Sequence, residues 1–127
     1  MQNIDRMFVL TGVLFILTGM VLGLYMGSHQ DYTLRPVHAH LNLLGFTLMM
    51  LFGFAYHIWP AMKDGKLALV HYVLHVIGTA GSMALLVKVL LDPPSGATFG
   101  PFMDGLAVMT TIGVLIFTYL FFTRAKN

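Results

Sequence analysis

The sequence contains no cysteine and very little charge. The absence of cysteine excludes disulfides, iron–sulfur clusters and thiolate zinc sites, and the absence of a CxxCH motif excludes the ordinary attachment of haem c. Charged residues make up 9% of the 127 residues, whereas soluble domains contain roughly 25%. The net charge of +2 is too small and too scattered to indicate nucleic-acid binding.

Apolar residues are correspondingly abundant, at 57% of the chain with a mean hydropathy of +0.81. This composition is typical of an integral membrane protein in a lipid bilayer. Four apolar runs are each close to the ~20 residues that a membrane-spanning helix needs. The sequence therefore predicts one all-α domain over residues 1–127, a four-helix bundle with transmembrane helices at about 7–26, 36–59, 67–91 and 102–122.

The links between the apolar runs indicate where the helices begin and end. Pro36 suits the first turn of the second helix, and Pro60 ends that helix. Residues 61–66 form a charged turn, and residues 92–101 are rich in turn-forming residues. Because the links are short, we expect neighbouring helices to be antiparallel.

Lysine and arginine near the helix ends predict the orientation. One side of the bundle carries Arg6, Lys63, Lys66, Arg124 and Lys126. The positive-inside rule then makes both termini cytoplasmic, in the cytoplasmic (inner) membrane of a bacterial or archaeal cell. His38 and His40 are expected near the outer face and His57 near the inner one. Asp104 is expected at the outer interface, where it can cap the fourth helix.

Four glycines of the first helix, at positions 12, 19, 23 and 27, lie on nearly one face. Small residues at this spacing allow a second helix to approach closely within lipid. The spacing is compatible with packing inside one protomer and with packing between protomers.

The stretch from Arg35 to Pro60 has the strongest functional pattern. His38 and His40 are two residues apart, which on a helix is a rotation of ~200°, so they cannot chelate one metal together. Each can present an imidazole to a different flank, where a haem would take one axial ligand, and Arg35 can pair with a haem propionate. Alternatively, one histidine bonds across helices and the other meets headgroups or water.

The third helix carries a second histidine pattern. His71 and His75 are four residues apart and therefore share a face. Together with His57 they predict a second metal site, for copper or zinc by ligand type. The alternative is that these histidines are interfacial polar residues. Tyr56, Tyr72 and Trp59 are expected in an aromatic belt.

The segment Arg35-x-x-His38, followed by Asn42, Gly45-Phe46 and Tyr56-x-x-x-Pro60, resembles the second transmembrane helix of haem–copper oxidase catalytic subunits, especially the nitric oxide reductase branch. The resemblance implies that His38 is an axial ligand of a low-spin haem. His38-Ala39-His40 also resembles the histidine–x–histidine pair of the family's tenth helix. The family's copper-site pattern is absent, so oxygen or nitric oxide reduction is not implied for this chain alone. If the chain is an enzyme, the resemblance implies an oxidoreductase of the haem–copper oxidase type.

The family subunit has twelve helices in three arcs of four, so the resemblance implies that three copies of this chain form a homotrimer. The leading hypothesis is a cytochrome with bis-histidine haem b at each subunit interface, coordinated by His38 of one protomer and His40 of the next. It would transfer electrons to a partner or bind a gas. Two alternatives are a copper or zinc handling protein and a cofactor-free assembly subunit of a larger oxidase.

Overall fold

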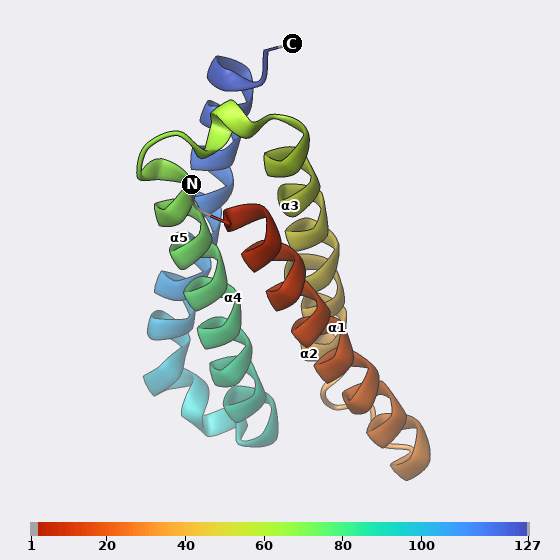
Figure 1. Cartoon of the computed structure of the whole chain (residues 1–127). Coiled ribbons are helices and arrows are strands. Elements are labelled where there is room, and N and C mark those ends of the chain that lie inside the picture. Colours follow the sequence, from red (N-terminus) through yellow and green to blue (C-terminus); the bar gives the residue numbers. More distant parts are fainter. Residues whose placement is uncertain (1–2, 127) are drawn as a thin grey trace.

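The computed structural model describes residues 3–126, which form four long helical segments (Figure 1). The first is α1 (Ile4–His29), and the second is a continuous run of α2 (Arg35–His40), the π-helical segment η1 (Leu41–Thr47) and α3 (Leu48–Ile58). The third and fourth are α4 (Leu67–Leu91) and α5 (Gly96–Arg124), with the short 3₁₀ turns η2 (Pro60–Lys63) and η3 (Pro93–Ser95) before them. All four segments are long and apolar enough to cross a membrane, which confirms the predicted four-helix fold class.

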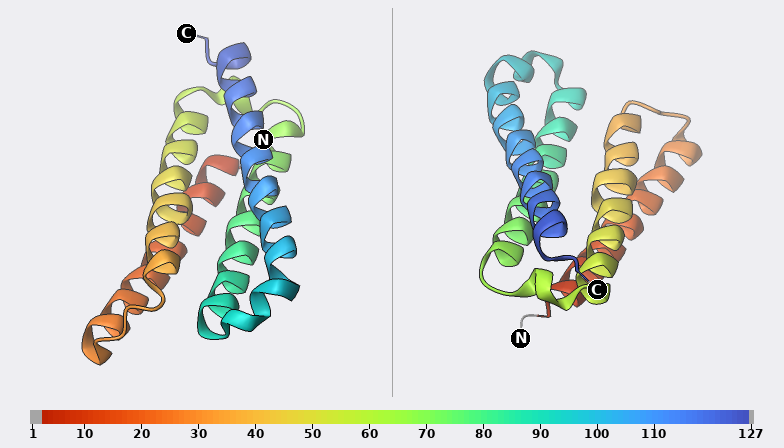
Figure 2. Two further views of the ribbon diagram at one scale, coloured as in Figure 1. Left: turned by 180° about the vertical axis from the view of Figure 1, so that it is seen from behind. Right: turned by 90° about the horizontal axis from the view of Figure 1, so that it is seen from above.

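The helices are arranged as two antiparallel hairpins. α1 packs along α2, η1 and α3, and α4 packs along α5. The hairpins meet at the end that carries both chain termini, which we call the termini end, and diverge toward the opposite end, which we call the open end (Figures 1 and 2). The open end contains the turns at residues 30–34 and 92–95.

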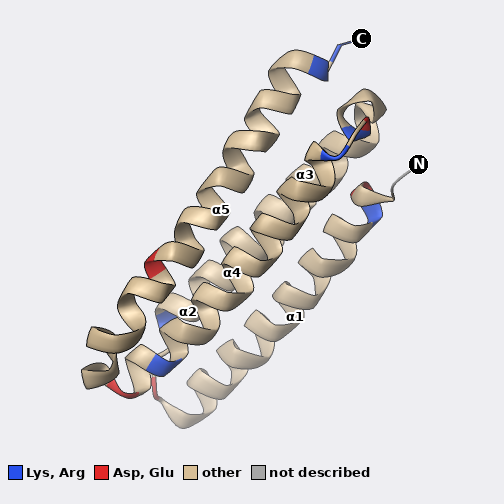
Figure 3. Cartoon of the chain, turned by 90° about the vertical axis from the view of Figure 1, so that its left-hand side faces the viewer, with Lys and Arg blue, Asp and Glu red and all other residues tan. Residues whose placement is uncertain are grey.

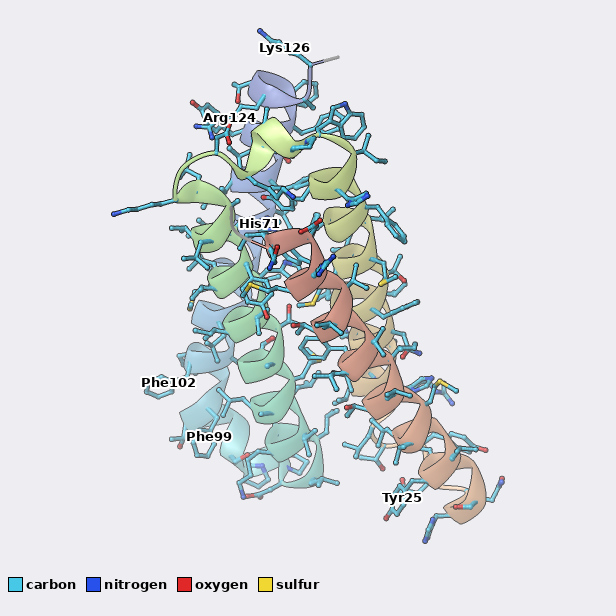
Figure 4. The ribbon with its side chains drawn as sticks, viewed as in Figure 1. Tyr25, His71, Phe99, Phe102, Arg124 and Lys126 are labelled. Atoms are coloured by element: carbon cyan, nitrogen blue, oxygen red, sulfur yellow. The ribbon has the colours of Figure 1, made fainter. Side chains whose placement is uncertain are left out.

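Most of the buried core lies toward the termini end. Its largest cluster joins all four segments and consists of Ile4, Phe8, Met49, Phe52, Tyr56, Met62, Ala68 and Leu120. A smaller cluster at the open end contains only Val37, Leu41 and Met83. Large apolar side chains also cover the outside of the bundle, as Phe102 does in Figure 4. Such a surface suits a lipid environment.

The ends of the helices follow local backbone chemistry. α1 ends where Gln30 adopts a left-handed conformation with φ of 52°. α3 ends before Trp59, because a residue that precedes a proline avoids the α conformation.

The start of α5 differs from the prediction. The helix begins at Gly96 rather than at about residue 102, so the prediction of a loop over residues 92–101 is wrong for its second half. Pro101 lies within the helix, close enough to its N-terminus that little of the hydrogen-bond ladder is lost. Ser95 occupies the N-cap position, and Asp104 lies more than two turns inside the helix. The expected capping role of Asp104 is therefore wrong.

Charged residues are concentrated at the two ends of the bundle, and one acidic residue lies along α5 between them (Figure 3). It is Asp104, the acidic residue of that helix. At the termini end, the Lys63 ammonium lies 3.5 Å from the Asp5 carboxylate, and the Arg124 guanidinium donates to the Asp64 carbonyl. The cations that the sequence analysis placed on one side do lie at one end.

Candidate functional site

His38 forms a cross-helix link between α2 and α1. Its Nδ1 lies 2.7 Å from the Gly19 carbonyl oxygen, which can only accept, so Nδ1 carries the proton. Nε2 then carries the lone pair, and the Asn42 amide nitrogen lies 3.3 Å from it and donates to it. Both ring nitrogens of His38 are therefore engaged within the protomer.

Two glycines of α1 make room for this link. A Cβ at Gly23 would lie 2.9 Å from Cε1 of His38, and a Cβ at Gly19 would collide with the Asn42 amide. Gly12 likewise faces Met49 on α3, whereas Gly27 has no atom within 4 Å of an added Cβ. Three of the four glycines of the predicted face thus pack inside the protomer.

His40 faces a different neighbourhood, as the helical spacing predicts. It is exposed, and its Nδ1 lies 2.7 Å from the Pro36 carbonyl oxygen, one turn earlier on its own helix. Nδ1 therefore donates, and Nε2 keeps its lone pair. Within residues 3–126, Nε2 of His40 makes no hydrogen bond.

His40 lines a groove of about 630 Å³ between the second helical segment, α4 and α5. Its walls include Pro36, His40, Ser82, Met83, Met103 and Asp104. The volume is in the range of roughly 300–1,000 Å³ that is typical of small-molecule sites. Asp104 is the only charged residue in the lining, and it has no ion-pair partner in the described part of the chain.

Arg35 begins α2 at the open end. Its guanidinium carbon lies 5.6 Å from the centre of the Tyr32 ring, a cation–π arrangement. The nearby Asp31 carboxylate accepts hydrogen bonds from the hydroxyl and the backbone N–H of Thr33, which lower the pKa of Asp31 below its ordinary value. Among the described residues Arg35 has no carboxylate partner, so its charge is available to an anionic ligand.

The structure does not bring His57, His71 and His75 together. His57 is exposed, and its Nδ1 lies 3.1 Å from the Asp5 carboxylate on α1. His71 and His75 are fully buried in the bundle. In residues 3–126, no group of three or more histidine, cysteine or acidic side chains is placed to hold a metal ion. The reason is that His57 lies on the outward face of α3.

His71 and His75 form a buried pair that also binds the second helical segment. The Tyr56 hydroxyl lies 2.8 Å from Nδ1 of His71, and Nε2 of His75 lies 3.0 Å from the Leu44 carbonyl oxygen in η1. Tyr56 is fully buried, so its assignment to an aromatic belt is wrong. The alternative that His71 and His75 are interfacial is wrong for the same reason.

Two residues of these arrangements had no role assigned to them from the sequence, although Asn42 is part of the motif that carries the resemblance. Asn42 lies four residues after His38, on the same helical face, and this spacing is a signal that could have identified it. The Leu44 carbonyl had no signal, because a π-helical segment that brings it to His75 is not visible in the apolar pattern. Comparisons with known proteins add no further assignment: no family model, no curated protein and no solved structure matches the chain.

Proposed function

We propose that this protein binds haem b at the open end of the bundle, with His40 as the first axial ligand. The observation that carries the proposal is the hydrogen bond from Nδ1 of His40 to the Pro36 carbonyl. A histidine held in this way presents a fixed Nε2 lone pair, which is the usual arrangement of a metal-ligating imidazole. His40, which carries this Nε2, also lines the groove of about 630 Å³.

The residues around His40 also suit the macrocycle and the propionates of a haem. The groove is mostly apolar, as the macrocycle requires, with Met83 and Met103 among its walls. Arg35 lies on the first turn of the same helix and has no carboxylate partner among residues 3–126, so it can bind a propionate. Bound haem would supply one-electron chemistry or gas binding, according to whether its second axial position is filled.

His38 is the proposed second ligand, supplied by a neighbouring copy in a homotrimer. In the protomer its ring lies against Gly23, and Asn42 occupies the nitrogen that iron would need. Ligation by His38 therefore requires the ring to turn away from α1 and Asn42 to release it. With both histidines bound the protein would transfer electrons, and with His40 alone it would keep an open position for a gas.

The orientation is part of the same proposal. The cationic termini end faces the cytoplasm, by the positive-inside rule, and the haem site lies toward the outer face of a bacterial or archaeal cytoplasmic membrane. Zinc or copper binding by the inner histidines is less well supported. Of the three inner histidines, only His71 and His75 lie close together, and a structural zinc ion takes four ligands.

The test is an absorption spectrum of the purified, haem-reconstituted protein, oxidised and reduced, with haem stoichiometry. His40→Ala should lose haem binding. His29→Ala is the matched control, because His29 is also exposed at the open end, and its hydrogen bonds within residues 3–126 go to Tyr25 and Ser28 of its own helix. Undiminished haem binding by His40→Ala would refute the assignment.

Asn42→Leu tests the second ligand. Removing the amide frees Nε2 of His38, so the low-spin, six-coordinate fraction should increase. A mass measurement in detergent tests the trimer, since a strictly monomeric protein with a full low-spin spectrum would refute ligation shared between copies.

A further inference from the structure

A groove of about 380 Å³ lies between α1 and α3 at the termini end. Gly53 allows the two helices to approach closely there, because a Cβ at this position would lie 2.8 Å from the Val9 side chain and 3.0 Å from the Asp5 carbonyl oxygen. The groove shares no lining residue with the groove of His40, so the two are separate sites. Its walls include Arg6, Val9, Leu10, Gly53, Phe54 and His57.

Polarity changes along the length of this groove. α1 begins at the termini end, so Arg6 lies near that end, and Val9 and Leu10 lie about one turn deeper in the bundle. α3 runs the opposite way, so His57 lies near the termini end and Phe54 about one turn deeper. The outer part of the groove is therefore polar and the inner part apolar. A phospholipid in a bilayer has the same order, with its headgroup outside its acyl chains.

Arg6 gives the outer part of the groove a positive charge. It is exposed, and within residues 3–126 it forms no ion pair. Asp5 also lines the groove, but its carboxylate accepts a hydrogen bond from Nδ1 of His57 at 3.1 Å and lies 3.5 Å from the Lys63 ammonium. The charge of Asp5 is thus offset by other residues, and the Arg6 guanidinium is left to bind an anion. A guanidinium can bind a phosphate group through two parallel hydrogen bonds.

The rest of the termini end has an excess of positive charge as well. Among the side chains of residues 3–126, two carboxylates at this end, Asp5 and Asp64, stand against five cations (Figure 3). The cations are Arg6, Lys63, Lys66, Arg124 and Lys126. Such an excess near a membrane surface attracts lipids with a net negative headgroup. A neutral lipid could cover the apolar part of the groove but would leave this charge without a counterion.

We propose that this groove binds one anionic phospholipid, with the phosphate at Arg6 and one acyl chain along Val9, Leu10 and Phe54. Basic pockets between membrane-spanning helices are typical sites for anionic headgroups. Leu10 is 66% exposed and Phe54 is 53% exposed, so the inner part of the groove is open to the surrounding lipid. The inference depends on the four candidate membrane spans and not on haem, so it applies equally to the cofactor-free protein.

The test titrates phosphatidylglycerol or phosphatidylcholine with the same acyl chains onto cofactor-free protein in detergent micelles, and native mass spectrometry counts the bound lipid. The wild type should bind phosphatidylglycerol more tightly. Arg6→Gln should weaken this binding about fivefold, the effect of one arginine near a membrane surface, and remove the preference. Lys66→Gln is the matched control, because it removes the same charge from the same end but lies outside the groove. Equal losses in the two variants, or undiminished binding by Arg6→Gln, would overturn the proposal.

Two further measurements test the acyl part of the site. Phe54→Ala removes an apolar wall but keeps Arg6, and it should weaken the binding of phosphatidylglycerol severalfold. Phe122→Ala is the control, because Phe122 is an exposed phenylalanine near the same end that does not line this groove. Inorganic phosphate at millimolar concentration should not displace the lipid. Displacement by phosphate, or equal effects of the two alanines, would show that Arg6 binds free anions without the groove and would refute the lipid assignment.

Discussion

The cross-helix position of His38 can be tested by adding one methyl group at each of two glycines of α1. Gly23 and Gly27 are four residues apart on the same helix, so an alanine has nearly the same backbone effect at both. A Cβ at position 23 would lie 2.9 Å from Cε1 of His38, whereas a Cβ at position 27 would meet nothing within 4 Å. The difference in stability between the two variants therefore measures the contact with the His38 imidazole, because the change in helix propensity is nearly the same in both.

The expected magnitudes follow from three terms. Alanine in place of glycine stabilises a helix by roughly 0.5–1 kcal/mol, and Gly27→Ala should show this gain alone. Gly23→Ala has the same gain, but overpacking costs about 1–3 kcal/mol. If the ring moves, losing the bond from Nδ1 to the Gly19 carbonyl costs about a further 0.5–1.5 kcal/mol. Together the three terms give a net destabilisation of about 0.5–4 kcal/mol for Gly23→Ala.

The measurement is the free energy of unfolding in mixed micelles titrated with SDS, followed by circular dichroism at constant lipid and detergent. We expect Gly27→Ala to unfold at slightly higher SDS than the wild type and Gly23→Ala at clearly lower SDS. Equal stability of the two variants would show that His38 is not packed on Gly23, and the argument that it is held within its own protomer would be refuted.

Two further variants test the packing of α4. Tyr56→Phe removes the hydroxyl that bonds His71 and leaves a buried ring nitrogen unpaired, so the free energy of unfolding should fall by about 1–3 kcal/mol; an unchanged value would show that His71 has another partner. Gly78→Ala places a Cβ 2.7 Å from the Leu106 carbonyl oxygen, and because both backbones resist movement it should destabilise the bundle by at least ~1–3 kcal/mol. Gly105→Ala, with open space around it, is the control and should not destabilise; equal effects of the two alanines would contradict the close α4–α5 contact.

The arrangement of helices was predictable because it depends on apolar length and on prolines. The third helix occupies Leu67–Leu91, the predicted range, since charged residues and prolines bound it on both sides. The start of α5 was not predictable in the same way. Residues 96–101 contain glycine and proline, which favour turns locally, yet in the structure they continue the helix. Local turn propensity was therefore a poor guide to this boundary.

Only those features of the candidate site that depend on the spacing of residues along a helix could be predicted. A spacing of two residues directs His38 and His40 to different flanks, and the structure shows different neighbours for them. The spacing could not show which of the two histidines keeps an unbonded ring nitrogen, because this depends on the glycines of α1. Similarly, the spacing of His71 and His75 predicts a shared face, but their distance from His57 depends on how α3 is rotated.

The open end of the bundle leaves α2 supported unequally on its two sides. On the α1 side, His38 and Asn42 hold it through hydrogen bonds and close contacts with glycine. Toward α4 and α5, α2 borders the groove that His40 lines. A second groove, apolar and of about 580 Å³, lies between α1 and α4 and is lined in part by Val37 and Leu41. The His38 ring, which is hydrogen-bonded to α1, thus anchors α2, whereas the His40 ring faces the groove.

This asymmetry also gives the order of events on ligand binding. A ligand that takes Nε2 of His40 needs no change in the protomer, because that nitrogen has no partner in the described chain. A ligand that takes His38 must first break its bond to Asn42, and the ring must leave the α1 glycines. If the protein binds haem as proposed, reconstitution should therefore first give the form that is held by His40 alone. Under the same proposal, binding by His38 should follow more slowly, and Asn42→Leu should shorten the delay without changing the first step.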